Sequence, residues 1–102
     1  MPPPPIKIIK GTDLKYHIQI ECAGFDIEDD EFCCIIRCGS IAKAIPKTEM
    51  VIGDDGFYVT TSTADFPCAP VTLTVLAQVP DPDFPNGTRL EKDRITLCQI
   101  IE

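Results

Sequence analysis

The 102-residue sequence has no tryptophan, a single histidine, and none of the short motifs that mark common enzyme classes. A GxSxG elbow, a P-loop, an HExxH pair and a glycine-rich phosphate loop are all absent from the chain, so the usual hydrolase, nucleotide and zinc-protease sites are not indicated. The histidine, His17, falls on the polar side of an alternating segment, whereas a Cys–His nucleophile needs a cysteine on the same side and an orienting group. We therefore expect no enzyme, no catalytic residue and no cofactor.

Positive charge is also scarce. Nine lysines and arginines stand against 16 aspartates and glutamates, which gives a formal net charge of −7. An acidic surface repels nucleic acid and anionic lipid, and no apolar run approaches the roughly 20 residues that cross a bilayer. Residues 1–5 are a methionine and four prolines, which lack the basic and apolar regions of a secretory signal. Nucleic acid, membrane and small-molecule substrates are therefore not expected partners.

The cysteines lack the CxxC spacing of zinc ribbons and thioredoxin-like sites; they are Cys22, Cys33, Cys34, Cys38, Cys68 and Cys98. On an extended strand Cys34 and Cys38 would lie about 13 Å apart, which is too far for a disulfide. The adjacent Cys33 and Cys34 would face opposite sides of a sheet, which disfavours a shared metal. We therefore predict reduced cysteines that are mostly buried, with an inter-sheet disulfide between Cys34 and Cys98 as the alternative.

Apolar and polar residues alternate along most of the chain, and a period of two is typical of half-buried strands. The predicted strands are residues 6–10, 14–22, 32–38, 41–45, 50–52, 57–61, 71–79 and about 89–101, with a turn at residues 53–56. No segment has a convincing helical period. The pattern predicts one all-β domain over residues 6–102, an Ig-like antiparallel β-sandwich of about seven strands. Residues 1–5 are expected to be a proline-rich tail.

The last predicted strand is apolar on both faces. Ile95, Leu97 and Ile101 alternate on one side, while Cys98 and Ile100 fall on the other. Such a strand lies either in the middle of the domain or against a partner, and we favour the middle.

A bend is expected at Gly11, because glycine inside a strand pattern marks a bulge or a turn. The side chains of Thr12 and Asp13 can hydrogen-bond to nearby backbone amides. We therefore assign these two residues a structural role in fixing the bend.

Two polar loops are the candidate binding sites, since loops on a rigid β-sandwich often carry recognition. The residues proposed to contact a partner are Asp26, Glu28, Asp29 and Asp30 in the first loop and Asp81, Asp83, Phe84 and Asn86 in the second. The second loop begins like a calcium-binding loop, but Pro85, Asn86 and Lys92 stand where a ligand, a glycine and a glutamate are required. No metal is therefore expected there. The sheet edges are further candidate surfaces.

Residues 8–14 resemble the opening of small Ig-like domains in bacteriophage tail and baseplate proteins. Residues 56–59, 72–75 and 80–87 are similar to segments of small phage or prophage proteins of gut anaerobes. Residues 8–14, which lead into the longest alternating stretch, are similar to the opening of the N-terminal domain in the baseplate upper protein family. The resemblance implies a structural module for assembly, and no catalytic residue comes with it.

The sequence therefore predicts a non-enzymatic structural or binding module in a phage- or prophage-derived tail or baseplate. Its expected partners are other virion subunits or further copies of itself, and its expected location is the virion or the host cytoplasm. One alternative is an exported adhesion domain at the cell surface or in the periplasm, which requires a removed signal and predicts disulfides. A second alternative is a metal-binding or thiol protein built on Cys33, Cys34 and Cys38.

Overall fold

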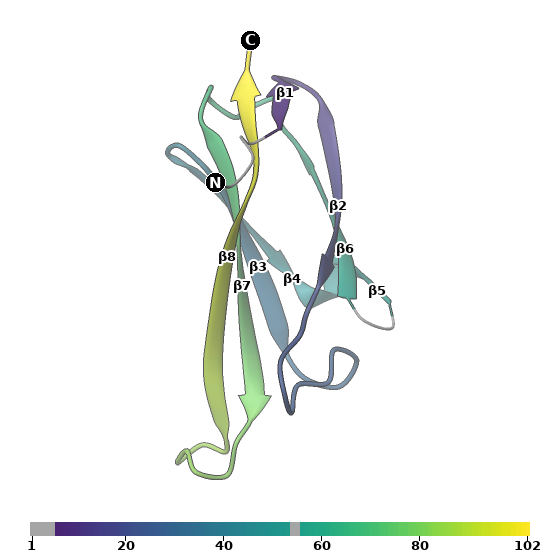
Figure 1. The fold of residues 1–102 in the computed structure, drawn as a ribbon, viewed down its shortest axis with the longest axis vertical. Helices are drawn as coiled ribbons and strands as arrows, with labels where there is room; N and C mark the ends of the chain where they lie inside the picture. Colours follow the sequence, from purple (N-terminus) through teal and green to yellow (C-terminus); the bar gives the residue numbers. More distant parts are fainter. Residues whose placement is uncertain (1–5, 54–55) are drawn as a thin grey trace.

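The computed structural model describes residues 6–53 and 56–102. The tail expected at residues 1–5 and the centre of the expected turn, Asp54 and Asp55, lie outside the described residues. Within the described ranges the regular elements are strands, apart from a 3-10 turn, η1 (Lys47–Glu49) (Figure 1). The described chain has no helix with the length and apolar character needed to cross a membrane.

The strands form two sheets that face each other (Figure 1). The larger sheet has the order β1-β8-β7-β3-β4, with β1 (Lys7–Ile9), β8 (Thr88–Ile101), β7 (Pro70–Pro80), β3 (Phe32–Cys38) and β4 (Ile41–Pro46). The smaller sheet has the order β2-β6-β5, with β2 (Asp13–Gln19), β6 (Gly56–Ser62) and β5 (Val51–Ile52). The expected all-β class is confirmed, but the described residues form eight strands where about seven were expected.

One strand pair departs from the expected antiparallel arrangement. β1 runs parallel to β8, with Lys7 beside Gln99 and Ile9 beside Ile101, whereas the other described pairs are antiparallel. After β1 the chain leaves the edge of the larger sheet and crosses directly to the smaller one (Figure 1). β1 and β2 therefore do not form a hairpin.

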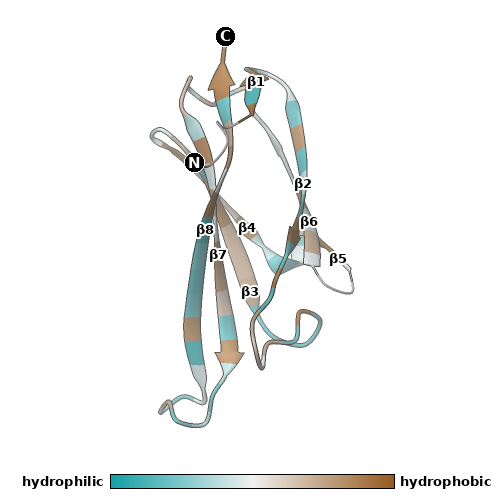
Figure 2. Cartoon of the chain, in the orientation of Figure 1, coloured by the Kyte–Doolittle hydropathy of each residue, from teal (hydrophilic) through white to brown (hydrophobic). Residues whose placement is uncertain are grey.

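Alternate side chains of both sheets meet in one apolar core. The smaller sheet contributes Leu14, Phe57 and Val59, and Phe66 enters from the connection between β6 and β7. The larger sheet contributes Phe32, Cys34, Ile36, Cys38, Val71, Leu73, Ala77, Val79, Leu97, Cys98 and Ile100. The core does not extend along all of β8, whose half next to the β7–β8 loop is mostly hydrophilic (Figure 2).

An irregularity in β8 explains why its apolar residues fall on both sides of an ideal strand. Val71 pairs with Cys98, but the next residue, Thr72, pairs with Thr96, so Leu97 is the extra residue of a β-bulge. The bulge moves the buried side by one residue, and both Leu97 and Cys98 are buried. β8 lies between β1 and β7 in the larger sheet. Because β1 pairs with only its last three residues, the predicted central position holds at that apolar end and is wrong for the rest of β8.

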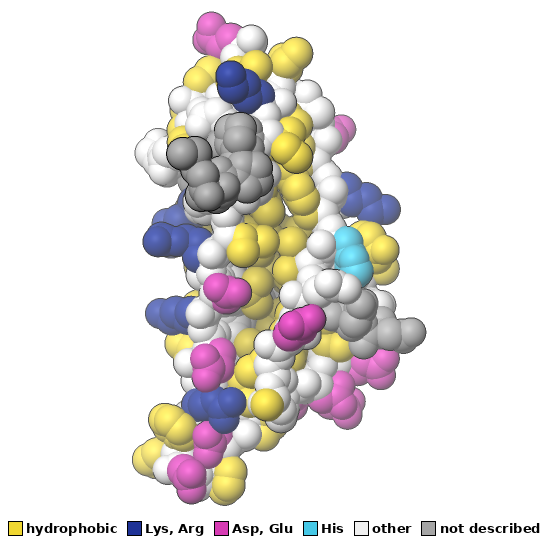
Figure 3. Space-filling view, viewed as in Figure 1, with side chains coloured by type: hydrophobic (Ala, Val, Ile, Leu, Met, Phe, Trp, Pro, Cys, Tyr) yellow, Lys and Arg dark blue, Asp and Glu magenta, His cyan; other side chains and the backbone are white. Residues whose placement is uncertain are grey.

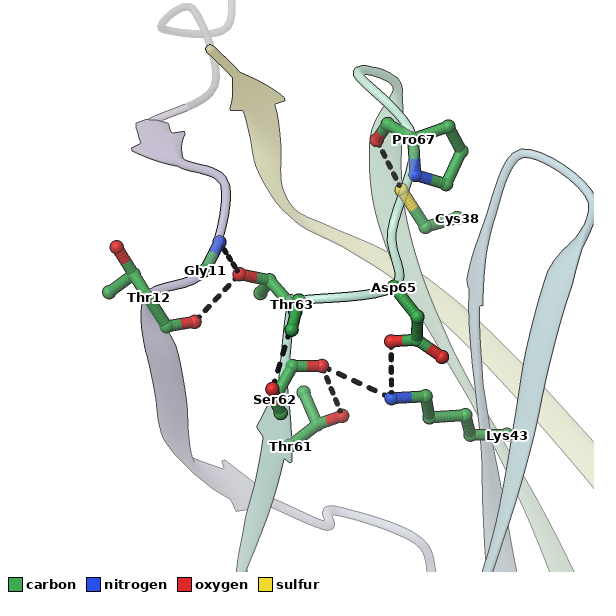
Figure 4. A network of polar contacts seen from close by, with 10 residues as sticks. Gly11, Thr12, Cys38, Lys43, Thr61, Ser62, Thr63, Asp65 and Pro67 are labelled. Carbon is green, nitrogen blue, oxygen red and sulfur yellow. Dashed lines mark hydrogen bonds and ion pairs between the residues drawn. The ribbon is translucent and has the colours of Figure 1, made fainter.

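The chain bends at Gly11 as expected, but a distant residue holds the bend (Figure 4). Gly11 has a φ of 97°, in the left-handed region that favours glycine. Its backbone N–H donates to the hydroxyl of Thr63, which donates in turn to the carbonyl of Thr12, each at 2.8 Å. The expectation named only the local side chains of Thr12 and Asp13 and missed this tertiary contact.

Candidate functional site

The first predicted loop is shaped by its own acidic residues. Asp26 Oδ1 accepts a hydrogen bond from the backbone N–H of Glu28 at 2.9 Å, and Asp30 Oδ2 accepts one from the backbone N–H of Asp26 at 2.8 Å. Lys47 Nζ, on η1, donates to the carbonyls of Glu28 and Asp30 at 2.7 and 2.8 Å. Asp26 and Asp30 therefore have structural roles, while Glu28 and Asp29 are exposed.

Asp81 has a similar structural role in the β7–β8 loop. Its Oδ1 accepts a hydrogen bond from the backbone N–H of Asp83 at 3.0 Å, and its Oδ2 accepts one from the Arg89 guanidinium at 2.8 Å. These two donors hold the pKa of Asp81 below its usual range. Phe84 is 45% exposed, and Asp83 and Asn86 are also exposed. These three residues remain the accessible part of the predicted surface.

The two loops do not combine into one polar site. Within the described ranges, no hydrogen bond or ion pair joins the predicted residues of one loop to those of the other. The same part of the chain contains no group of three or more His, Cys, Asp or Glu side chains arranged to hold a metal. What the loops offer is therefore separate, solvated surfaces.

The cysteines form no cross-link: all six have free thiols. Cys34, Cys38 and Cys98 are fully buried, whereas Cys68 is exposed. The alternative of an inter-sheet disulfide between Cys34 and Cys98 is wrong, because both residues belong to the larger sheet, with β7 between their strands. Two strand spacings of about 4.8 Å each exceed the reach of a disulfide.

Burial makes these thiols poor nucleophiles. It raises the pKa of Cys34 to about 12 and also raises the pKa of Cys38 and of Cys98. Cys38 Sγ donates to the carbonyl of Pro67 at 3.3 Å (Figure 4). The hydroxyl of Tyr16 hydrogen-bonds to the sulfur of Cys98, and burial together with this bond raises the pKa of Tyr16 to about 12. Since the thiolate is the reactive form, thiols with raised pKa values stay protonated and unreactive near neutral pH. We therefore assign Cys34, Cys38 and Cys98 a packing role in the core.

A groove of about 330 Å³ lies between the sheets, bordered by β8 on one side and by β2 and the residues after it on the other. Its floor is apolar and is formed by Ile18, Ile20, Cys22, Val75, Ala77 and Ile95. β2 is an edge strand of the smaller sheet, and no described strand covers the adjoining edge of β8. Figure 3 shows hydrophobic side chains in a band along this open side, with charged side chains beside it. The two layers are therefore not closed here.

Carboxylates stand on both borders of the groove. Glu91 and Asp93 face it, because their partners on β7 are floor residues and cross-strand partners share a face. Glu21 lines the opposite border. Lys92, which also borders the groove, and Arg94 alternate with the two β8 carboxylates along the strand. Their side chains therefore point toward the outer face of the sheet. The groove is thus apolar at its floor and acidic at its rim.

The sheet edges were predicted as candidate surfaces, but the residues of this groove were not among the predicted sites. The alternation along β8 contains a clue to the groove. Asp93 and Glu91 lie two and four residues before Ile95, so they fall on the same inward face of the strand. Carboxylates on the inner side of a sheet indicate a part that the second sheet does not cover. This clue can be used only once the register between β7 and β8 shows which face of β8 points inward.

Comparison of the chain with protein-family models, with curated proteins and with solved structures finds no match. The function is therefore proposed from the geometry of the molecule itself. In that geometry the groove is the feature that combines apolar surface, charge and free backbone edges.

Proposed function

We propose that this protein is a non-enzymatic binding module whose groove receives part of another protein. The observation that carries the proposal is the apolar floor left open between β2 and β8. Ile95 lies on the inner side of its sheet and is still 40% exposed. Burial of apolar surface contributes about 25 cal/mol per Å², so a partner that covers the floor gains binding energy without breaking any described strand pair.

The strand order supports an Ig-like β-sandwich for this module. In Ig-like domains one sheet contains strands B, E and D, and the other contains G, F, C and, in the variable type, C′. β2-β6-β5 corresponds to B-E-D, and β8-β7-β3-β4 corresponds to G-F-C-C′. In the full Ig plan, strand A pairs with strand B. No described strand takes that place beside β2, and the groove lies along this side.

We further propose a phage- or prophage-derived particle as the setting, which would make the partner another structural subunit. The support is the resemblance of residues 8–14 to Ig-like tail and baseplate domains and of the later short segments to small phage or prophage proteins. The six free thiols favour this setting over an exported adhesion domain, for which disulfides are expected. Thiol titration in denaturant would give six reactive groups per chain in the first case and fewer in the second.

Co-expression with the products of neighbouring genes tests the binding function. We expect one of them, a structural protein, to co-elute with this chain in size-exclusion chromatography. Ile95→Glu, which places a charge on the groove floor, is expected to abolish the complex. Phe84→Glu, on the β7–β8 loop, is the matched control and is expected to leave it intact. The absence of any complex, or its loss with Phe84→Glu and not with Ile95→Glu, would overturn the groove as the binding surface.

A further inference from the structure

We propose that the groove is a strand-acceptor site, in which an extended segment of another protein adds to the free edge of β8. The side chains of that segment that face the groove are apolar and basic. This inference rests on the proposed function and specifies how the partner binds. It follows from three properties of the groove: a free backbone edge, an apolar floor and an acidic rim.

The backbone edge of β8 has no described strand partner along most of its length. β7 pairs with one side of β8 from Thr88 to Gln99. On the other side, β1 pairs only with the last three residues, and the carbonyl of Ile6 accepts the N–H of Gln99 at 2.8 Å. The unpaired N–H and C=O groups of such an edge are a template for main-chain hydrogen bonds to an added strand.

The floor and the rim define which side chains such a strand should have. Successive residues of a strand point to opposite faces, so every second side chain of the added strand enters the groove. Moving along β8, these side chains meet Ile95, then Asp93, then Glu91. An apolar side chain fits beside Ile95 over the floor, and lysine or arginine reaches Asp93 and Glu91. Glu21 on the opposite border adds a third carboxylate.

The charges of β8 disfavour a second copy of this chain as the occupant. Two β8 strands related by a two-fold axis pair antiparallel, and partners must share a face. Centring the pair on Lys92 opposes two lysines and places Glu91 against Asp93. Centring it on Asp93 opposes two aspartates and places Lys92 against Arg94. Both arrangements set like charges directly opposite each other, which is destabilising, and the net charge of −7 adds further repulsion.

A synthetic peptide of sequence TVTKTKTVT serves as the probe. Its lysines and valines share one face, and its order is the same in both directions, so the probe needs no assumed orientation. Fluorescence anisotropy with the full chain measures its affinity. A peptide with glutamate in place of both lysines is expected to bind at least about tenfold more weakly, because it opposes the acidic rim. In the E91K/D93K double variant this preference is expected to reverse.

Two controls separate strand addition from general charge attraction. The R94E variant changes the outer face of the same strand at a residue that does not border the groove, and it is expected to leave the affinity for the lysine peptide within about twofold. Amide exchange followed by NMR is expected to show that the peptide protects alternate amides between Leu90 and Ile95, which is the pattern of a new strand on one edge. A variant that begins at Ile6 is expected to bind the peptide with the same affinity as the full chain.

Several results would overturn this inference. Strand addition would be excluded if the peptide preference were unchanged in E91K/D93K, or if the bound peptide protected no alternate amides on β8. Either result would stand even if a neighbouring gene product binds the groove in another way. Peptide binding only by the variant that begins at Ile6 would assign the groove to the protein's own first residues. Sedimentation as a dimer with the β8 amides already protected would assign it to a second copy.

Discussion

The hydroxyl oxygen of Thr63 lies 2.8 Å from the backbone nitrogen of Gly11, although 52 residues separate them in sequence. The same hydroxyl donates to the carbonyl of Thr12 at 2.8 Å. Gly11 and Thr12 form the turn between β1, in the larger sheet, and β2, in the smaller one. A single fully buried side chain therefore links the crossing between the sheets to the end of β6.

Replacing Thr63 with valine should destabilise the protein by about 1–2 kcal/mol, because it removes both hydrogen bonds and keeps the shape of the side chain. Urea unfolding measures the change. Thr60→Val is the matched control, since Thr60 is exposed on β6, the strand that ends just before Thr63, and its effect should stay within about 0.5 kcal/mol. Equal effects of the two substitutions would contradict the role given to Thr63.

Lys47→Met should loosen the acidic loop while keeping the aliphatic stem of the side chain. The ammonium group donates to the carbonyls of Glu28 and Asp30 and also lies 5.5 Å from the centre of the Phe32 ring. Loss of these contacts should cost about 1–2 kcal/mol and speed amide exchange at Asp30 several-fold. Lys7→Met, at an exposed position on β1, should leave the exchange of the loop unchanged. Unchanged exchange in Lys47→Met would show that the loop is ordered by its own turns.

Gly56→Ala should be strongly destabilising, whereas Gly53→Ala should be tolerated. A Cβ on Gly56 would collide with the carbonyl oxygen of Ile18 on the neighbouring strand, whereas one on Gly53 would lie 3.6 Å from the carbonyl oxygen of Gly56, an ordinary contact. Because backbone atoms of β2 cannot move away without breaking strand pairs, we expect a loss of about 2 kcal/mol or more at Gly56. Thermal unfolding of the two variants gives the comparison, and similar melting temperatures would refute the close packing of β2 on β6.

The protein should lose stability above pH 9 because its buried thiols resist ionisation. The pKa of Cys34 rises from 9.0 to about 12 on folding, so between these values the unfolded chain has lost this proton and the folded one still holds it. The unfolded state then binds fewer protons, and stability falls with rising pH, by up to about 1.4 kcal/mol per pH unit for this group. Below pH 9 the thiol is neutral in both states, and Cys34 no longer contributes to the pH dependence of stability.

Urea unfolding at a series of pH values tests this reasoning. Cys34→Ala should have a shallower decline above pH 9 than the natural chain, even though losing the side chain lowers its stability at every pH. Tyr16→Phe should also flatten the decline, but only from about pH 10, since the pKa of Tyr16 rises from 10.0 to about 12. Cys68→Ala is the control, because that residue is exposed; if its pH profile differs from the natural one as much as that of Cys34→Ala, burial is not the cause.

The strands and their inward faces could be predicted from the sequence alone. Alternation from Leu14 onward, between Phe32 and Cys38, and along the segment that became β7 identified strands and the sides that are buried. This works because a strand has a side-chain period of two, which is a local property that the hydrophobic pattern records directly. Gly11 likewise marked a bend through its own conformational freedom.

Only the tertiary structure decided how the strands are ordered and what they leave open. The parallel contact of β1 with β8, the bulge at Leu97 and the bond from Thr63 to Gly11 each depend on residues far apart in sequence. The alternating pattern of a single strand does not specify its neighbour. The groove was missed for the same reason: Glu91 and Asp93 read as ordinary solvated charges until the register with β7 placed them on the inner side of an uncovered sheet.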